Sequence, residues 1–165
     1  MDRRLRLFRQ GQRVLDLGAF PGSWSLYAGE RVGLTGRVLG IDIQEPRGSF
    51  PPNVEMRQGD AFAVTPEELG GQFHVVLSDM AHSTIGARMA DQARSAQLFE
   101  AALETAKRVL VPGGAFVGKL FQGPDFEALR KAMRAAFDEV RVMKPDASRS
   151  ESYEIFLVGL RRKKN

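Results

Sequence analysis

The fold is decided by Val14-Leu15-Asp16-Leu17-Gly18-Ala19-Phe20-Pro21-Gly22, a stretch near the start of a 165-residue chain. A short strand-like run leads directly into a turn with two glycines, and a helical pattern follows the turn. Doubly wound α/β sheets bind nucleotide-like ligands at such a turn, at the carboxyl end of the first strand. The stretch therefore predicts a sheet of this kind, with a ligand site beside its first strand.

Strand and helix patterns alternate along the rest of the chain. Strands are predicted over residues 13–17, 38–42, 54–58, 74–78, 115–120, 139–143 and 154–159, and helices over residues 23–30, 90–109 and 125–137. A further short helix is predicted to begin at Thr65, which is followed by a proline and, three residues on, by Glu68, as in a capping box. The alternation predicts an α/β fold: a doubly wound, mostly parallel seven-stranded sheet with helices on both faces, of the Rossmann-like type.

Composition excludes several classes of function. With 43% hydrophobic and 27% charged residues, the chain is typical of one globular domain, and it has neither a membrane-length apolar run nor an apolar leader. We expect a single cytoplasmic, monomeric domain over residues 1–165. Cysteine is absent and only His74 and His82 carry imidazoles, so we predict no metal site. The net charge of +4 favours polyanionic partners such as nucleic acid.

The first three strands end in groups that suit a nucleoside. Three residues separate Gly18 from Gly22, so the turn lacks the G-x-G-x-x-G spacing that brings a helix to a pyrophosphate. This argues against a dinucleotide-dependent dehydrogenase. Asp42, at the end of the second strand, is placed to accept hydrogen bonds from ribose hydroxyls, and Asp60, after the third, suits an adenine amino group. Acidic strand ends favour a cationic nucleoside such as S-adenosylmethionine over a polyphosphate. Taken singly, each aspartate is explained equally well as a turn cap.

The later strands deliver a different set of groups. The fourth strand leads into Asp79, the fifth carries Lys119, and the last begins with Glu154. Methyl transfer from a sulfonium needs an aligned nucleophile and a route for its proton. Lys119 is a candidate to hold a hydroxyl or to remove its proton, with the two carboxylates orienting the amine. The alternative is a structural ion pair, or a lysine that reaches the surface.

With these residues in view, the sequence resembles the FtsJ family of RNA ribose 2'-O-methyltransferases, also called RrmJ. The resemblance runs from Val14-Leu15-Asp16-Leu17-Gly18 to Lys144-Pro145-Asp146-Ala147-Ser148-Arg149 and Glu154. It implies the Rossmann-like methyltransferase fold, and it matches Asp79, Lys119 and Glu154 to three members of the family's Lys-Asp-Lys-Glu catalytic tetrad. For S-adenosylmethionine, and its product S-adenosylhomocysteine, it implies a site at Gly22, Trp24, Asp42, Asp60 and Asp79, to which the glycine turn adds Gly18.

Two departures from the family pattern leave alternatives open. The family's first lysine lies upstream of the first strand, whereas residues 1–11 contain arginines and no lysine. We expect either that an upstream N-terminal segment is missing from this chain or that the protein lacks that group. His82 stands where relatives have proline, and is either a solvated loop residue or a contact to the substrate nucleotide.

The resemblance implies a substrate as well. The first candidate is a ribose 2'-hydroxyl of large-subunit (23S) ribosomal RNA, most simply at a uridine, with the large subunit as partner. The alternatives are a transfer RNA ribose, and a catalytically degenerate RNA-binding or ribosome-assembly factor. Candidate contacts to the RNA backbone are Arg141, Lys144, Arg149 and the tail Arg161-Arg162-Lys163-Lys164, although such a tail is equally well explained as a frayed, solvated end.

Overall fold

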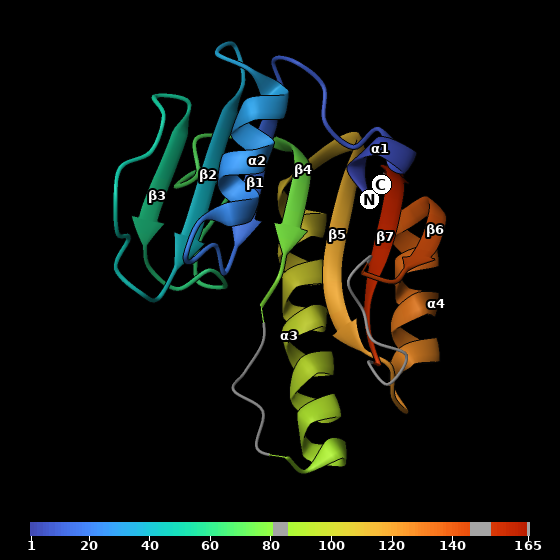
Figure 1. The fold of residues 1–165 in the computed structure, drawn as a ribbon. Helices are drawn as coiled ribbons and strands as arrows, with labels where there is room; N and C mark the ends of the chain where they lie inside the picture. Colours follow the sequence, from blue (N-terminus) through green and yellow to red (C-terminus); the bar gives the residue numbers. More distant parts are fainter. Residues whose placement is uncertain (81–85, 146–152, 165) are drawn as a thin grey trace.

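A computed structural model describes residues 1–80, 86–145 and 153–164, and its centre is one seven-stranded sheet (Figure 1). The strands are β1 (Arg13–Leu17), β2 (Arg37–Asp42), β3 (Val54–Gln58), β4 (Phe73–Ser78), β5 (Leu110–Phe121), β6 (Phe137–Met143) and β7 (Glu154–Arg162). They lie in the order β3-β2-β1-β4-β5-β7-β6, and β7 runs antiparallel to both of its neighbours. The predicted doubly wound, mostly parallel sheet is confirmed, and most predicted strands differ from these bounds by one to five residues.

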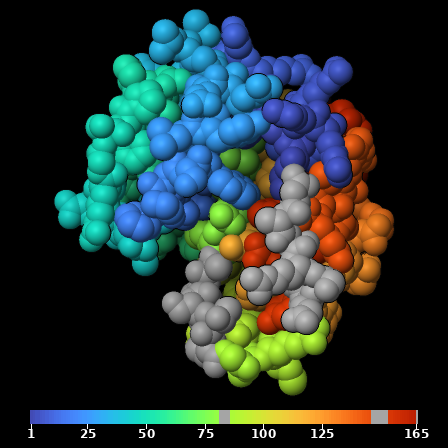
Figure 2. Space-filling view, viewed as in Figure 1, coloured from blue at the N-terminus to red at the C-terminus, as the bar shows by residue number. Residues whose placement is uncertain are grey.

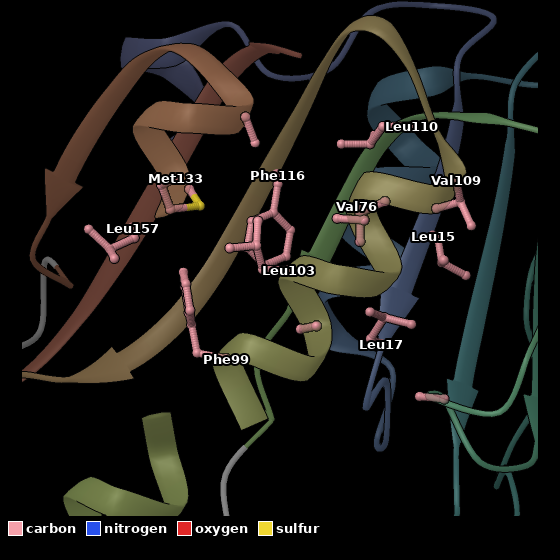
Figure 3. Close-up of a cluster of buried hydrophobic side chains, with 14 of the residues drawn as sticks. Leu15, Leu17, Val76, Phe99, Leu103, Val109, Leu110, Phe116, Met133 and Leu157 are labelled. Atoms are coloured by element: carbon pink, nitrogen blue, oxygen red, sulfur yellow. The ribbon is translucent and has the colours of Figure 1, made fainter. Parts of the chain in front are cut away.

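Helices cover both faces of the sheet. They are α1 (Asp2–Leu5), α2 (Ser23–Val32), α3 (Arg88–Val109) and α4 (Phe126–Ala136). Side chains of α3 and α4 pack with Leu15 and Phe116 in one buried cluster, shown in Figure 3, and those of α2 pack with Val14 and Val117 in the other. Neighbouring residues of one strand thus enter different cores, because successive side chains of a strand point to opposite faces.

The predicted short helix at Thr65 is wrong, although its capping box forms. The N–H of Thr65 donates to Glu68 Oε2 at 2.9 Å, and the N–H of Glu68 donates to Thr65 Oγ1 at 3.3 Å. Gly70 and Gly71 then take φ values of 78° and 122°, which leave the helical region. The chain therefore makes one hydrogen-bonded turn and goes on to β4.

The short helix α1 was not predicted. Its Asp2 is buried, and Oδ2 accepts a hydrogen bond from the Tyr27 hydroxyl at 2.9 Å and an ion pair from Arg31 at 3.1 Å. Both partners belong to α2, so a tertiary contact fixes α1 against that helix. Four residues are too few for a helix to be stable by itself, and the local sequence carries no sign of these contacts.

The direction of the strands decides where a site can form. The carboxyl ends of β1 to β5 meet at one edge of the sheet because these strands are parallel. Since β7 is antiparallel to β5, its first residue, Glu154, lies at the same edge. Across the described ranges, no helix is both long and apolar enough to cross a membrane.

Candidate active site

A pocket of about 340 Å³ lies at the carboxyl edge of the sheet. Its lining includes four of the predicted cofactor residues, which are Gly18, Asp42, Asp60 and Asp79. The volume is within the range of small-molecule sites, and three carboxylates make its lining acidic. The edge therefore offers a pocket suited to a cationic small molecule.

Asp42 ties the glycine-rich turn to the end of β2. The N–H of Phe20 donates to Asp42 Oδ2 at 2.9 Å, and the N–H of Gln44 donates to Oδ1 at 2.9 Å. Asp60 Oδ1 likewise accepts the N–H of Phe62 at 2.9 Å. Both aspartates do cap turns, yet each carboxylate oxygen has a second lone pair for a ligand. Capping and ligand binding are thus compatible in this pocket.

A glycine is required at position 18 because the side chain of Met80 lies close to its backbone. Its φ is 71°, and a Cβ atom at this position would overlap the side chain of Met80, which also lines the pocket. Only a residue without a side chain lets Met80 close that wall of the pocket.

Trp24 and Gly22 are not brought into this pocket. The Trp24 ring packs against Phe156, with ring centroids 5.4 Å apart, in the cluster on the α2 face. It lines a larger pocket of about 550 Å³ whose walls are mainly apolar. Gly22 is the N-cap of α2, with the Phe50 ring against it. Cofactor contacts by Gly22 and Trp24 stay predictions, and a contact by Trp24 to the acidic pocket would have to come from its main chain.

Asp16 was not among the predicted site residues, although it is the next-to-last residue of β1, the strand that decides the fold. It is 1% exposed, and the Ser25 hydroxyl donates to its Oδ2 at 2.7 Å. Within the described ranges, its Oδ1 has no hydrogen-bond partner. Burial raises the pKa of Asp16 to about 7; the neighbouring carboxylates of Asp79 and Asp42 add to the rise, and the Ser25 bond opposes it. Asp16 is therefore close to its titration point at neutral pH.

The predicted catalytic residues lie together beside the acidic pocket. Lys119 Nζ is 3.1 Å from Asp79 Oδ1 and 3.9 Å from Glu154 Oε1. The lysine side chain is 15% exposed, and the two carboxylate side chains are about one-third exposed. β5 pairs with β4 on one side and β7 on the other, so the pairing of strands brings the three groups together. Figure 2 shows atoms of these three strands side by side at the surface.

The predicted RNA contacts are placed only in part. His82 and Arg149 lie outside the described residues. Arg141 pairs with Glu139, whereas Lys144 is exposed. Two arginines of the predicted tail belong to β7, and Arg162 Nη2 donates to the carbonyl of Lys107 at 3.1 Å. A frayed end is therefore wrong for that part of the tail, while a role in RNA binding stays a prediction.

Metal binding finds no support in the described part of the chain. No group of three histidine or acidic side chains is arranged there to hold an ion.

The sheet order, with an antiparallel strand inserted next to the edge and a pocket at the carboxyl ends, defines a Rossmann-like methyltransferase fold. A solved Plasmodium falciparum structure named as a ribosomal RNA methyltransferase has this fold, with a TM-score of 0.81 at 22% identity over 99% of this chain and 93% of that one. Human methyltransferase-like protein 13, solved in complex with SAH, matches with a TM-score of 0.70 at 15% identity over 98% of this chain and 80% of that one.

The chain belongs to the FtsJ-like methyltransferase family, whose family model matches residues 1–162. It is 52% identical to a protein of Sorangium cellulosum over 99% of this chain and 78% of that protein. It is 51% identical to a protein of Syntrophobacter fumaroxidans over 98% of this chain and 84% of that protein. Both relatives are named ribosomal RNA large subunit methyltransferase E. The family expected from the sequence is thereby confirmed.

Proposed function

We propose that this protein transfers a methyl group from S-adenosylmethionine to a ribose 2'-hydroxyl of 23S ribosomal RNA, at a uridine. The single observation that carries the proposal is Lys119, held by Asp79 and Glu154 at the rim of an acidic pocket. Membership of the FtsJ-like family and the names of its relatives support the type of reaction and the class of RNA. We also infer that the protein acts in the cytoplasm, where its proposed substrate is made.

The residues present fit S-adenosylmethionine. Asp42 and Asp60 each keep acceptor capacity for ribose and adenine groups, and the acidic lining suits a positive charge. Among the described residues, the Oδ1 of buried Asp16 has no hydrogen-bond partner, and the carboxylates of Asp79 and Asp42 are its charged neighbours. A cation bound there would offset the desolvation of Asp16. When bound, the cofactor supplies an electrophilic methyl group on a sulfonium. Asp42, Asp60 and Asp79 would hold it.

Lys119 positions the hydroxyl in this mechanism. A lysine ammonium group donates up to three hydrogen bonds. Asp79 Oδ1, at 3.1 Å, is within hydrogen-bond distance of Lys119 Nζ, whereas Glu154 Oε1, at 3.9 Å, makes an ion pair only, so donors remain for the ribose oxygen. Fixing an oxygen in line with an electrophile contributes much of the barrier reduction in such displacements. The hydroxyl proton would leave to the Glu154 carboxylate or to water as the oxygen takes the methyl group. Asp79 belongs both to the pocket lining and to the ion pair, and so links cofactor and hydroxyl.

The decisive experiment incubates the protein with methyl-labelled cofactor and with ribosomal RNA that lacks its own modifications. We expect label on one ribose 2'-oxygen of the large-subunit RNA, at a uridine, mapped by protection from alkaline cleavage. Label on transfer RNA alone would favour the alternative substrate. Tight RNA binding without transfer to any RNA would favour the degenerate assembly factor and overturn the proposed activity.

A further inference from the structure

An arginine stacks on a tyrosine at the edge of the catalytic cluster. The guanidinium carbon of Arg88 lies 4.8 Å from the centre of the Tyr153 ring. The Tyr153 ring in turn meets the Phe121 ring edge to face, with centroids 5.3 Å apart and an interplanar angle of 76°. Arg88 is exposed and the two rings are partly buried. A cation is thus held over a supported aromatic face.

These three residues are neighbours of the catalytic groups in the chain. Tyr153 directly precedes Glu154, and consecutive Cα atoms are about 3.8 Å apart. Phe121 follows Lys119 by two residues and is paired with Glu154 across the sheet. The stack therefore adjoins the place where the ribose would bind.

Hydrogen bonds between α3 and the end of β5 keep the stack in place. The N–H of Phe121 donates to Ser95 Oγ at 2.9 Å, and Gln92 Nε2 donates to the carbonyl of Gln122 at 2.6 Å. The N–H of Gln122 donates to the carbonyl of Tyr153 at 2.8 Å. The beginning of α3, which carries Arg88, is thus bound to the segment that carries the rings.

A second arginine on an aromatic ring shows what a purely structural pair looks like. Arg13 lies over the Phe73 ring at 4.6 Å, and its guanidinium donates to the carbonyls of Leu69, Gly70 and Gln72 at 2.9 to 3.1 Å. Its donors are used within the protein. For Arg88, by contrast, the described residues supply no hydrogen-bond or ion-pair partner to the guanidinium, so its donors remain available.

We propose that Arg88 binds a backbone phosphate of the RNA next to the nucleotide that is methylated, and that Tyr153 is the positioning residue for its guanidinium. A guanidinium binds phosphate through paired N–H donors, and an aromatic face restricts its orientation. Asp79 and Glu154 carry negative charge at the same edge, so a phosphate there needs a nearby cation that is not already paired with them. This inference rests on the proposed function, because it takes the polyanion to be the RNA substrate.

The test measures KM and kcat for an unmodified large-subunit RNA fragment, and RNA affinity against salt concentration by fluorescence anisotropy. We expect Arg88→Ala to raise KM about tenfold and to lower the salt slope by about one, with most of the loss in KM. Arg88→Lys keeps the charge without the paired donors and should keep the slope while KM rises less. Tyr153→Leu should raise KM several-fold at unchanged slope, and Tyr153→Phe, which keeps the ring, should recover most of that loss.

Arg13→Ala is the matched control. It removes an arginine from an aromatic ring away from the catalytic cluster, and should lower the melting temperature while KM and the salt slope stay as in the parent. An Arg88→Ala protein with parental KM and slope would overturn the inference, and so would equal losses in Arg13→Ala. If the parent transfers no methyl to any RNA, the proposed function fails, and the anisotropy comparison still decides for or against Arg88.

Discussion

The two halves of the candidate site are held together in different ways. In the cofactor half, main-chain N–H groups fix the carboxylates: Asp42 accepts hydrogen bonds from Phe20 and Gln44, and Asp60 from Phe62. In the reactive half, side chains fix one another, as Lys119 does with Asp79 and Glu154. Neighbouring strand ends of one sheet thus carry a pocket whose aspartates are fixed by main-chain hydrogen bonds and a cluster whose side chains are fixed by ion pairs.

This difference predicts which substitutions should change cofactor affinity and which should change the rate of methyl transfer. A main-chain donor remains when a neighbouring side chain is changed, so the cofactor half should tolerate changes in the reactive half. An ion pair lasts only as long as both partners are present, so the reactive half should fail as a unit. Chemistry and cofactor affinity should therefore be separable by mutation of Lys119 and Asp42.

The largest effect is expected at Lys119. Replacing it with alanine should lower the rate of methyl transfer about 1,000-fold, because the hydroxyl loses its positioning group and two carboxylates lose their cation. Cofactor affinity, measured by calorimetry, should fall little, since Asp42 and Asp60 stay fixed by main-chain N–H groups and Asp79 alone of the three pocket carboxylates loses its lysine partner. Lys119→Arg keeps the charge and should retain part of the activity if the lysine acts by orienting the hydroxyl. A parallel loss of cofactor affinity in Lys119→Ala would contradict the separation of the two halves.

The second prediction concerns Asp16, whose pKa is raised by burial and further by Asp79 of one half and Asp42 of the other. In the unfolded chain its pKa is near 3.8 and in the folded protein about 7. Between these values the folded protein keeps the proton and the unfolded chain has lost it, so stability is full below about pH 4, falls as pH rises, and levels off above 7. Each pKa unit corresponds to about 1.4 kcal/mol, which gives a total near 4 kcal/mol.

Asp16→Asn tests this prediction because asparagine does not titrate and can still accept the Ser25 hydrogen bond. Free energies of unfolding from urea titrations at pH 4 to 8 should show the parent losing up to about 4 kcal/mol relative to the variant. Curves that stay parallel across this range would show that Asp16 is ionised throughout. A cationic ligand in the pocket should reduce the difference, since it favours the carboxylate.

The smallest effect is expected at Asp42. Asp42→Ala removes the acceptor for the N–H groups of Phe20 and Gln44, and we expect cofactor affinity to fall about tenfold to fiftyfold. Methyl transfer at saturating cofactor should change less than about threefold, because the Lys119 cluster is not touched. Asp42→Asn, which keeps an acceptor oxygen, should lie between. Equal affinity of parent and Asp42→Ala would remove Asp42 from the site.

Local sequence was sufficient for the elements that depend on local physics. Strand periodicity and the glycine turn predicted β1 at its observed bounds. The positions of Asp79, Lys119 and Glu154 at strand ends, together with the family resemblance, predicted that these three residues lie close to one another, as they do. The raised pKa of Asp16 could not be predicted, because it depends on how tightly α2 covers the end of β1. The direction of the Trp24 ring is likewise set by packing on Phe156, which is far away in the chain.

The contact between Arg88 and Tyr153 could not be predicted from local sequence either. It joins residues 65 positions apart, and neither stands in a pattern that distinguishes it from an ordinary surface residue. The turn at Thr65 shows the opposite error. A correct local pattern was present, and the two glycines that followed it decided the outcome.

The reversed direction of β7 also has a practical consequence for single-molecule work. β7 begins at the catalytic edge with Glu154 and ends at Arg162, and nine residues of strand span about 27 Å. The chain therefore leaves the sheet at the edge opposite the Lys119 cluster (Figure 1). A fluorophore or surface tether attached beyond Arg162 would lie about one strand length from the Lys119 cluster, so that the enzyme could be immobilised there and observed during turnover.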